Sequence, residues 1–103
     1  FPDQVAAVIM EPMNVTEPKD GFLHKVAELA RKNGAVFIFD ETITGFRFAN
    51  GGAQEYFGVT PDIATFGKGL ANGYPVSAVV GKADIMRQME ELGGVPPSWT
   101  RGR

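Results

Sequence analysis

The sequence predicts an α/β fold with a partial, mostly parallel sheet and flanking helices. Short and almost entirely apolar runs recur along the chain, separated by amphipathic stretches and by turns rich in glycine and proline. Such runs are typical of strands that are buried on both faces of a parallel sheet. The strand–helix–strand order near the start of the chain predicts a parallel pair of strands with a right-handed crossover.

The first predicted strand spans residues 5–10 (VAAVIM). It ends at Glu11-Pro12, because proline restricts the residue before it and cannot donate a ladder hydrogen bond. A helix is predicted over residues 21–32, with Asp20 as its N-cap. One stripe of this helix is apolar, which predicts the residues that it buries: Phe22, Leu23, Val26, Leu29 and Ala30.

The remaining apolar runs predict three more strands and two more helices. The predicted strands are 35–39 (AVFIF), 63–66 (IATF) and 76–80 (VSAVV), and the predicted helices are a short one near 53–57 (AQEYF) and a longer one over 82–92. Residues 67–75 are rich in glycine and predict a loop. We therefore expect an ordered unit over residues 1–92 and an irregular or disordered tail over residues 93–103.

Composition narrows the class of protein. The chain has 103 residues, of which 44% are hydrophobic and 21% charged, as expected for at most one globular domain. A net charge of −2 gives no electrostatic footprint for nucleic acid or an anionic membrane, and the lack of cysteine excludes disulfides and zinc–thiolate sites. No apolar run approaches the roughly 20 residues of a membrane span, and no signal peptide is visible. We expect a cytoplasmic location, and the initial Phe1 suggests a piece of a longer protein.

Three polar residues follow the ends of predicted strands. Glu11 follows the strand 5–10, Asp40 follows the strand 35–39, and Lys68 follows Gly67 after the strand 63–66. Ligands of open α/β sheets bind outside the carboxyl ends of the strands. We therefore expect Glu11, Asp40 and Lys68 to converge on one edge of the sheet as a binding site.

The pairing of Asp40 with Lys68 matches the needs of pyridoxal phosphate chemistry. The amine of Lys68 would form a Schiff base with the cofactor's aldehyde, and the carboxylate of Asp40 would keep the pyridine nitrogen protonated. Partial desolvation of a lysine favours the neutral amine that this reaction requires. The structural alternatives are a solvated loop lysine and an aspartate that forms a cap or turn.

Other residues near these strand ends have competing interpretations. Glu41 could be the ligand in place of Asp40, or could simply be solvated. The Asp40-Glu41 pair also resembles a Walker B element, but Lys68 is followed by Gly69 instead of the Ser or Thr of a Walker A motif. Arg47 could bind a substrate carboxylate or form a structural ion pair, and the ion pair is the preferred interpretation.

We assign no catalytic role to the single histidine or to the aromatic residues. His24 lies on the predicted polar side of the first helix and is expected at the surface. Four aromatic residues are expected to pack in the core or in loops instead of forming a stacking platform: Phe46, Phe48, Tyr56 and Phe57.

Taken together, the motifs resemble those of the class III pyridoxal-phosphate-dependent aminotransferases, in the branch around glutamate-1-semialdehyde 2,1-aminomutase. The resemblance covers about residues 4–91. It is carried by the segments IMEP (9–12), FIFDETITGFRF (37–48), YFGVTPDIATFGKGLANGYPVSAVVGK (56–82) and ADIM (83–86).

The resemblance implies a role for several residues of this chain. Lys68 matches the Schiff-base lysine, which also moves the proton between substrate and cofactor. Asp40 matches the partner of the pyridinium nitrogen, and Thr42 matches a position that packs on the ring, where the family usually has valine. Ile43 stands where many relatives have a glutamine that touches the cofactor's phenolic oxygen, which points toward the aminomutase-like branch.

The resemblance also implies that residues 1–92 are a central fragment of the large domain of a fold-type I transferase. Such enzymes work as homodimers on a small amino donor and an oxo acceptor, and their phosphate-binding loop and stacking aromatic lie upstream of this region. In relatives a threonine after the last helix reaches the partner's phosphate, but the surroundings of Thr100 fit that pattern poorly. The alternatives to an aminotransferase or aminomutase are a catalytically inactive fragment and an unrelated nucleotide-binding α/β module.

A fragment of this kind would leave part of its sheet uncovered. Exposed strand edges and an apolar sheet face favour association with other chains. We therefore expect the isolated 103-residue chain to be marginally stable or to self-associate.

Overall fold

The computed structural model describes residues 3–91, without the side chains of residues 89 and 90. The predicted tail over residues 93–103, including Thr100, lies outside this range. The elements are β1 (Ala7–Met10), α1 (Phe22–Lys32), β2 (Val36–Glu41), α2 (Gly52–Phe57), β3 (Ile63–Phe66), the short 3₁₀ helix η1 (Lys68–Leu70), β4 (Ala78–Gly81) and α3 (Ala83–Glu91). None of the helices in this range is long and apolar enough to cross a membrane.

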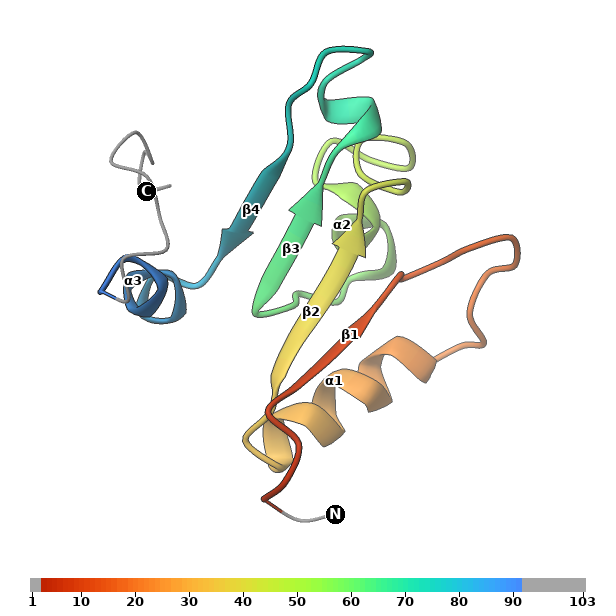
Figure 1. The fold of residues 1–103 in the computed structure, drawn as a ribbon. Helices are drawn as coiled ribbons and strands as arrows, with labels where there is room; N and C mark the ends of the chain where they lie inside the picture. Colours follow the sequence, from red (N-terminus) through yellow and green to blue (C-terminus); the bar gives the residue numbers. More distant parts are fainter. Residues whose placement is uncertain (1–2, 92–103) are drawn as a thin grey trace.

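The strands form a single sheet in the order β1-β2-β3-β4 (Figure 1). β1 and β2 are parallel and connected through α1, and β2 and β3 are also parallel, which confirms the predicted mostly parallel α/β fold. β4 is antiparallel to β3. Its first residue is Ala78 and not Val76, because Val76 still belongs to the turn, where its amide donates to the carbonyl of Tyr74.

Helix α1 begins one residue later than predicted and without the predicted cap. Gly21, with φ +77°, occupies the N-cap position, and no side chain caps the helix, so the assignment of Asp20 as N-cap is wrong. The residues that α1 buries are Leu23, Ala27 and Ala30.

The predicted apolar stripe of α1 is rotated relative to the face that is buried. Leu23 and Ala30 are buried as expected, whereas Phe22 and Leu29 are 48% and 61% exposed. Phe22 and Leu29 are seven residues apart and lie on one flank of the helix, since 3.6 residues make a turn. The small side chain of Ala27 lets the other flank approach the sheet, so the flank with Phe22 and Leu29 faces outward.

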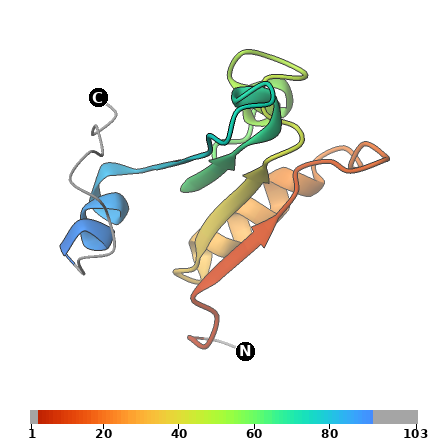
Figure 2. The same cartoon turned by 45° about the horizontal axis from the view of Figure 1, so that its top comes forward.

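One face of the sheet is covered and contains the core. Helix α1 lies against this face (Figure 2). Phe37 and Phe39 of β2 point into it and stack edge to face with ring centroids 4.9 Å apart, and Phe39 is completely buried. Ala64 of β3 is also buried in this cluster.

The other face is less covered, so the strands are not buried on both faces within the described part of the chain. This agrees with the expectation that a fragment would leave an apolar face of its sheet uncovered. Ile9, Ile38 and Ile63 lie side by side on this face by register. Ile9 is 63% exposed, while Ile38 and Ile63 are half-buried. The strands are apolar on both faces, but α1 covers only one of them, and Asp40 lies at the carboxyl end of the open face.

Asp62 connects the amino end of β2 with the carboxyl end of β4, at the end of the sheet opposite to Asp40. One carboxylate oxygen of Asp62 accepts a hydrogen bond from the Phe37 amide at 2.8 Å, and the other lies 2.7 Å from Nζ of Lys82. Burial alone would raise the pKa of Asp62. The hydrogen bond and positive charge of Lys82, together with the hydrogen bond from the Phe37 amide, outweigh this effect, so the pKa of Asp62 is lowered. This cluster stabilises the end of the sheet opposite to Asp40.

Candidate functional site

Asp40 is held at the carboxyl end of β2 by hydrogen bonds to a single carboxylate oxygen. By register Asp40 lies beside Thr65 of β3, and the hydroxyl of Thr65 donates to Oδ1 of Asp40 at 3.0 Å. The hydroxyl of Thr42 donates to the same oxygen at 2.6 Å, and the amide of Thr42 does so at 3.1 Å. The three donors orient the carboxylate on the open face of the sheet.

These hydrogen bonds also keep Asp40 ionised. The hydroxyl and the amide of Thr42 lower the pKa of Asp40 most, and burial raises it by less. The hydroxyl of Thr65 and the positive charge of Lys68 lower the pKa further. No residue in the range 3–91 donates to Oδ2 of Asp40. An oriented carboxylate with one oxygen left to accept a hydrogen bond fits a protonated pyridine nitrogen.

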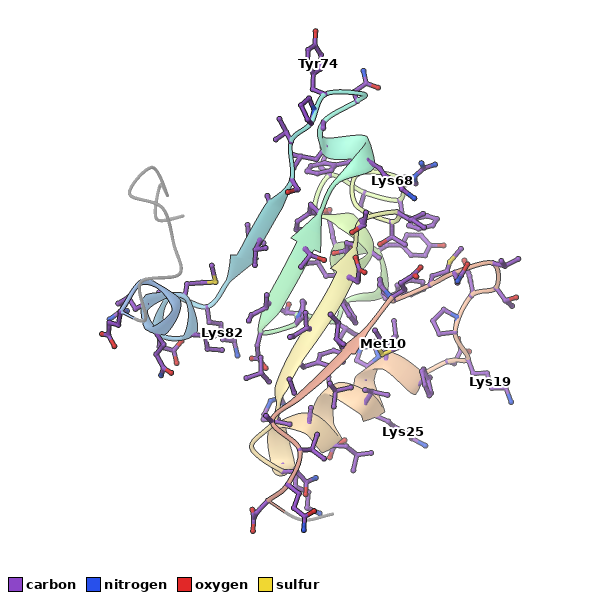
Figure 3. The ribbon with its side chains drawn as sticks, in the orientation of Figure 1. Met10, Lys19, Lys25, Lys68, Tyr74 and Lys82 are labelled. Carbon is purple, nitrogen blue, oxygen red and sulfur yellow. The ribbon has the colours of Figure 1, made fainter. Side chains whose placement is uncertain are left out.

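Lys68 lies just beyond the carboxyl end of β3 (Figure 3). β3 is the strand that pairs with β2, which carries Asp40. Lys68 is exposed, so the partial desolvation expected from the sequence is wrong within the described part of the chain. It begins η1, and its φ of +24° is a conformation that residues other than glycine rarely adopt. The turn is closed by hydrogen bonds from the amide of Leu70 to the Gly67 carbonyl at 2.7 Å and from the amide of Asn72 to the Lys68 carbonyl at 2.9 Å. Backbone strain of this kind is concentrated at functional sites, where the surrounding structure maintains it.

The loop after β2 lies directly against the turn that carries Lys68. A Cβ atom added to Gly67 would lie 3.3 Å from Cγ2 of Thr42, and one added to Gly69 would lie 3.1 Å from the carbonyl oxygen of Gly45. The two glycines that flank Lys68 therefore allow the close approach of the loop. Thr42 therefore connects Asp40, to which it donates hydrogen bonds, with the turn that carries Lys68.

Glu41 faces the opposite side of the sheet from Asp40 and is completely buried. Its Oε1 accepts hydrogen bonds from the hydroxyl of Thr44 at 3.1 Å and from the amide of Ala53, and its Oε2 accepts from Nε2 of Gln54 at 2.9 Å. Glu41 is therefore neither solvated nor placed as an alternative ligand to Asp40. The signal was present in the sequence, because Glu41 is in phase with the inward-facing Phe37 and Phe39.

The remaining candidates take no part in this hydrogen-bond network. Glu11 is exposed at the carboxyl end of β1, and no described residue hydrogen-bonds to its side chain. Arg47 is exposed and forms no ion pair with any described carboxylate, which contradicts the preferred interpretation as a structural ion pair. His24 is exposed, as predicted. In the described part of the chain no group of three or more potential ligands could hold a metal ion.

The aromatic residues of the loop after β2 pack against aromatic residues of β3 and α2, which agrees with the predicted packing role. Phe46 lies 5.7 Å from Phe66, Phe48 lies 5.4 Å from Tyr56, and Tyr56 lies 4.9 Å from Phe57, measured between ring centroids. The contact between Phe46 and Phe66 lies immediately beside the turn of Lys68. These rings stabilise the loop after β2.

A family model of the class III aminotransferases matches residues 1–99. The chain belongs to this family. The resemblance inferred from the motifs around Asp40 and Lys68 is therefore confirmed, and the nucleotide-binding alternative has no support.

The most similar relatives include aminomutases and a transaminase. Over 97 residues the chain is 55% identical to the glutamate-1-semialdehyde 2,1-aminomutase of Alkaliphilus oremlandii and 50% identical to that of Methanocaldococcus jannaschii. In each case the match covers 90% of this chain and 23% of the relative. The crystal structure of an omega-transaminase from Sphaerobacter thermophilus matches with a TM-score of 0.75 and 38% identity, covering 93% of this chain and 22% of the transaminase. The chain thus spans less than a quarter of the length of these relatives.

Proposed function

We propose that this chain supplies the reactive lysine and the ring-nitrogen carboxylate of a pyridoxal-phosphate-dependent aminotransferase or aminomutase. The observation that carries the proposal is the arrangement of Asp40 and Lys68. Asp40 is oriented and kept ionised by three donors to one oxygen, and Lys68 lies beyond the adjacent strand, where its charge lowers the pKa of Asp40.

When bound, pyridoxal phosphate supplies an aldehyde and an electron-accepting ring. Oδ2 of Asp40 would accept the hydrogen bond from the protonated ring nitrogen, since the threonine donors engage Oδ1. An ionised carboxylate at this point raises the proton affinity of that nitrogen. Thr42 contacts both parts of the proposed site: its hydroxyl donates to Asp40, and its methyl group faces Gly67 beside Lys68.

Lys68 would bind the cofactor through Nζ and then move a proton. Its side chain is exposed, so Nζ is accessible to the cofactor. After the substrate amine has displaced it, the free amine of Lys68 would carry the proton to and from the substrate carbon. Small movements of the turn would change the reach of Nζ, so the loop packed against it matters for the reaction.

The relatives favour an aminomutase reaction as the first to assay. Proteins named glutamate-1-semialdehyde 2,1-aminomutase are 46–55% identical over most of this chain. Ile43 contributes an apolar side chain, 41% exposed, next to Thr42. Assaying the complete gene product with glutamate-1-semialdehyde and with a panel of amino donors and oxo acceptors will separate the aminomutase from the aminotransferase. The homodimer and the cytoplasmic location stay predictions.

The experiment that tests the proposed site uses the visible spectrum of the complete gene product with pyridoxal phosphate. We expect wild type and the Lys25→Ala control to show the visible absorption of lysine-bound cofactor, and Lys68→Ala to lack it. Lys25 is a suitable control because it is an exposed lysine on α1. An identical spectrum for wild type and Lys68→Ala would contradict the proposal.

For the isolated 103-residue chain we propose weak or absent cofactor binding. The chain covers 23% of the relatives named above, and one face of its sheet exposes Ile9. Sedimentation analysis of the isolated chain tests the associated prediction: self-association is expected, whereas a monomer with cooperative unfolding would contradict it.

A further inference from the structure

We infer that Glu41 is a positioning residue for the proposed site: its buried carboxylate holds the loop of residues 42–51 against the turn that carries Lys68. The inference rests on the proposed function, because it concerns the same lysine and the same cofactor. Glu41 itself does not touch the open face of the sheet where Asp40 lies, so it would act through the loop and not on the reacting atoms.

The first support is the way in which Glu41 joins the two ends of the loop. At the start of the loop it accepts a hydrogen bond from Thr44, which is only 3% exposed. At the other end it accepts from Ala53 and Gln54, the second and third residues of α2. A single side chain therefore links the end of β2 to the beginning of α2.

The second support is the chemical environment of the carboxylate. Glu41 is completely buried, and its three donors are a hydroxyl, a backbone amide and a side-chain amide, with no cation among the described residues that bond to it. A buried carboxylate is costly unless its hydrogen bonds are satisfied. Any movement of the loop that breaks these bonds is therefore strongly disfavoured.

The third support is the space around the carboxylate. Gly52 has φ +76°, and a Cβ atom added to it would lie 2.6 Å and 2.8 Å from the two carboxylate oxygens of Glu41. The backbone at the start of α2 thus closes directly over the carboxylate. Gly52 is required both for the left-handed conformation and for this approach.

The loop held in this way contacts both partners of the site. Thr42 donates two hydrogen bonds to Asp40, and its methyl group faces Gly67. The carbonyl oxygen of Gly45 lies against Gly69. Loosening the loop would therefore alter the position of Lys68 and the orientation of Asp40 together.

The test compares substitutions of Glu41 in the complete gene product. Glu41→Ala removes all three hydrogen bonds, whereas Glu41→Gln keeps the shape and one acceptor oxygen. In Glu41→Gln/Gln54→Glu the side-chain amide of residue 41 donates to the carboxylate of residue 54. The hydrogen bond between the two side chains is thereby restored, with the negative charge on residue 54 instead of residue 41. Glu28→Ala is the control, because Glu28 is an exposed acid on α1, outside the loop of residues 42–51.

Three measurements are made on each variant: the dissociation constant for pyridoxal phosphate, hydrogen exchange over residues 42–53, and the pH dependence of acylation of Lys68 in cofactor-free protein. We expect Glu41→Ala to raise the dissociation constant for pyridoxal phosphate about tenfold or more, because a loosened loop no longer holds Asp40 and Lys68 in the binding geometry beforehand. Its loop should exchange faster, and the acylation profile of Lys68 should shift. We expect Glu41→Gln/Gln54→Glu and Glu28→Ala to stay within about threefold of wild type, because the hydrogen bonds of residue 41 are complete in both.

Wild-type cofactor affinity and a wild-type acylation profile in a folded Glu41→Ala protein would overturn the inference. If Glu41→Ala does not fold, Thr44→Val takes its place, because it removes one donor and keeps the carboxylate; unchanged affinity and loop exchange in that variant would equally overturn it. The proposed function fails separately, when Lys68→Ala retains the wild-type spectrum.

Discussion

A side chain added at Gly45 would clash with β3, so we predict that Gly45→Ala disturbs both stability and cofactor binding. The new methyl group would lie 2.5 Å from Cδ1 of Phe66 and 2.8 Å from the carbonyl oxygen of Glu41. Real Cβ atoms do not approach other atoms so closely, so either the ring or the backbone must move. Phe66 precedes the turn of Lys68, and its displacement would be transmitted to the lysine.

The expected cost follows from the type of clash. Overpacking a well-packed site by one methyl group destabilises a protein by about 1–3 kcal/mol. The backbone of Gly45 lies outside the left-handed region, so no conformational cost is added. Gly34→Ala is the matched comparison, because Gly34 has φ +69° and nothing lies within 4 Å of its added Cβ. Its cost should be purely conformational, about 1–2 kcal/mol.

A double-mutant cycle separates these two causes. Urea unfolding of the complete gene product would be followed for Gly45→Ala and Gly34→Ala, each with and without Phe66→Leu, which removes part of the clashing ring. We expect coupling between Gly45→Ala and Phe66→Leu, of about 0.5 kcal/mol or more, and additivity for Gly34→Ala. Of the two glycine substitutions, we expect Gly45→Ala to weaken cofactor binding and Gly34→Ala to leave it unchanged. Additive effects for both glycines, or unchanged cofactor binding in Gly45→Ala, would refute the reasoning.

Three further predictions concern individual side chains. Thr65→Val removes one donor to Asp40 and should raise the pKa of that carboxyl, so the acid limb of the pH profile of cofactor binding should move to higher pH; an unmoved limb would count against the hydrogen bond. Asp62→Asn should destabilise the protein at neutral pH by weakening the contact with Lys82. Because the pKa of Asp62 is lowered in the folded state, the difference in unfolding free energy between wild type and variant should shrink as pH falls below 3.8, the ordinary pKa of aspartate. A constant difference in urea unfolding across this range would contradict the prediction. Phe39→Ala should cost about 3–5 kcal/mol of stability, because the ring is completely buried; a loss below about 1 kcal/mol would show that the core is not where the structure places it.

The parts of the site predicted from the sequence are those that depend on local pattern. The apolar run before Asp40 and the run before Gly67 each predict a strand, and parallel strands bring their carboxyl ends to one edge. Asp40 and Lys68 therefore could be paired without a structure. The specific motifs around them then identified the family.

The parts that were missed depend on packing between distant segments. The three donors to Glu41 come from residues 3, 12 and 13 positions further along the chain, and no local pattern brings Ala53 and Gln54 back to the end of β2. The orientation of α1 was likewise decided by contact with the sheet, because the small Ala27 approaches it more closely than Leu29. β4 is antiparallel to β3 because the connection over residues 67–77 returns the chain beside β3 without a crossover helix, which a parallel strand would need.

The central claim is that Lys68 binds the cofactor covalently while Asp40 orients its ring. The most direct measurement is to incubate the complete gene product with pyridoxal phosphate, reduce it with borohydride, and locate the modified lysine by mass spectrometry. Borohydride adds hydride to the carbon of the carbon–nitrogen double bond and leaves the pyridoxyl group permanently on the lysine nitrogen. The account predicts modification at Lys68 in wild type and in Lys25→Ala, and its loss in Lys68→Ala. Modification at other lysines with Lys68 unmodified would contradict it.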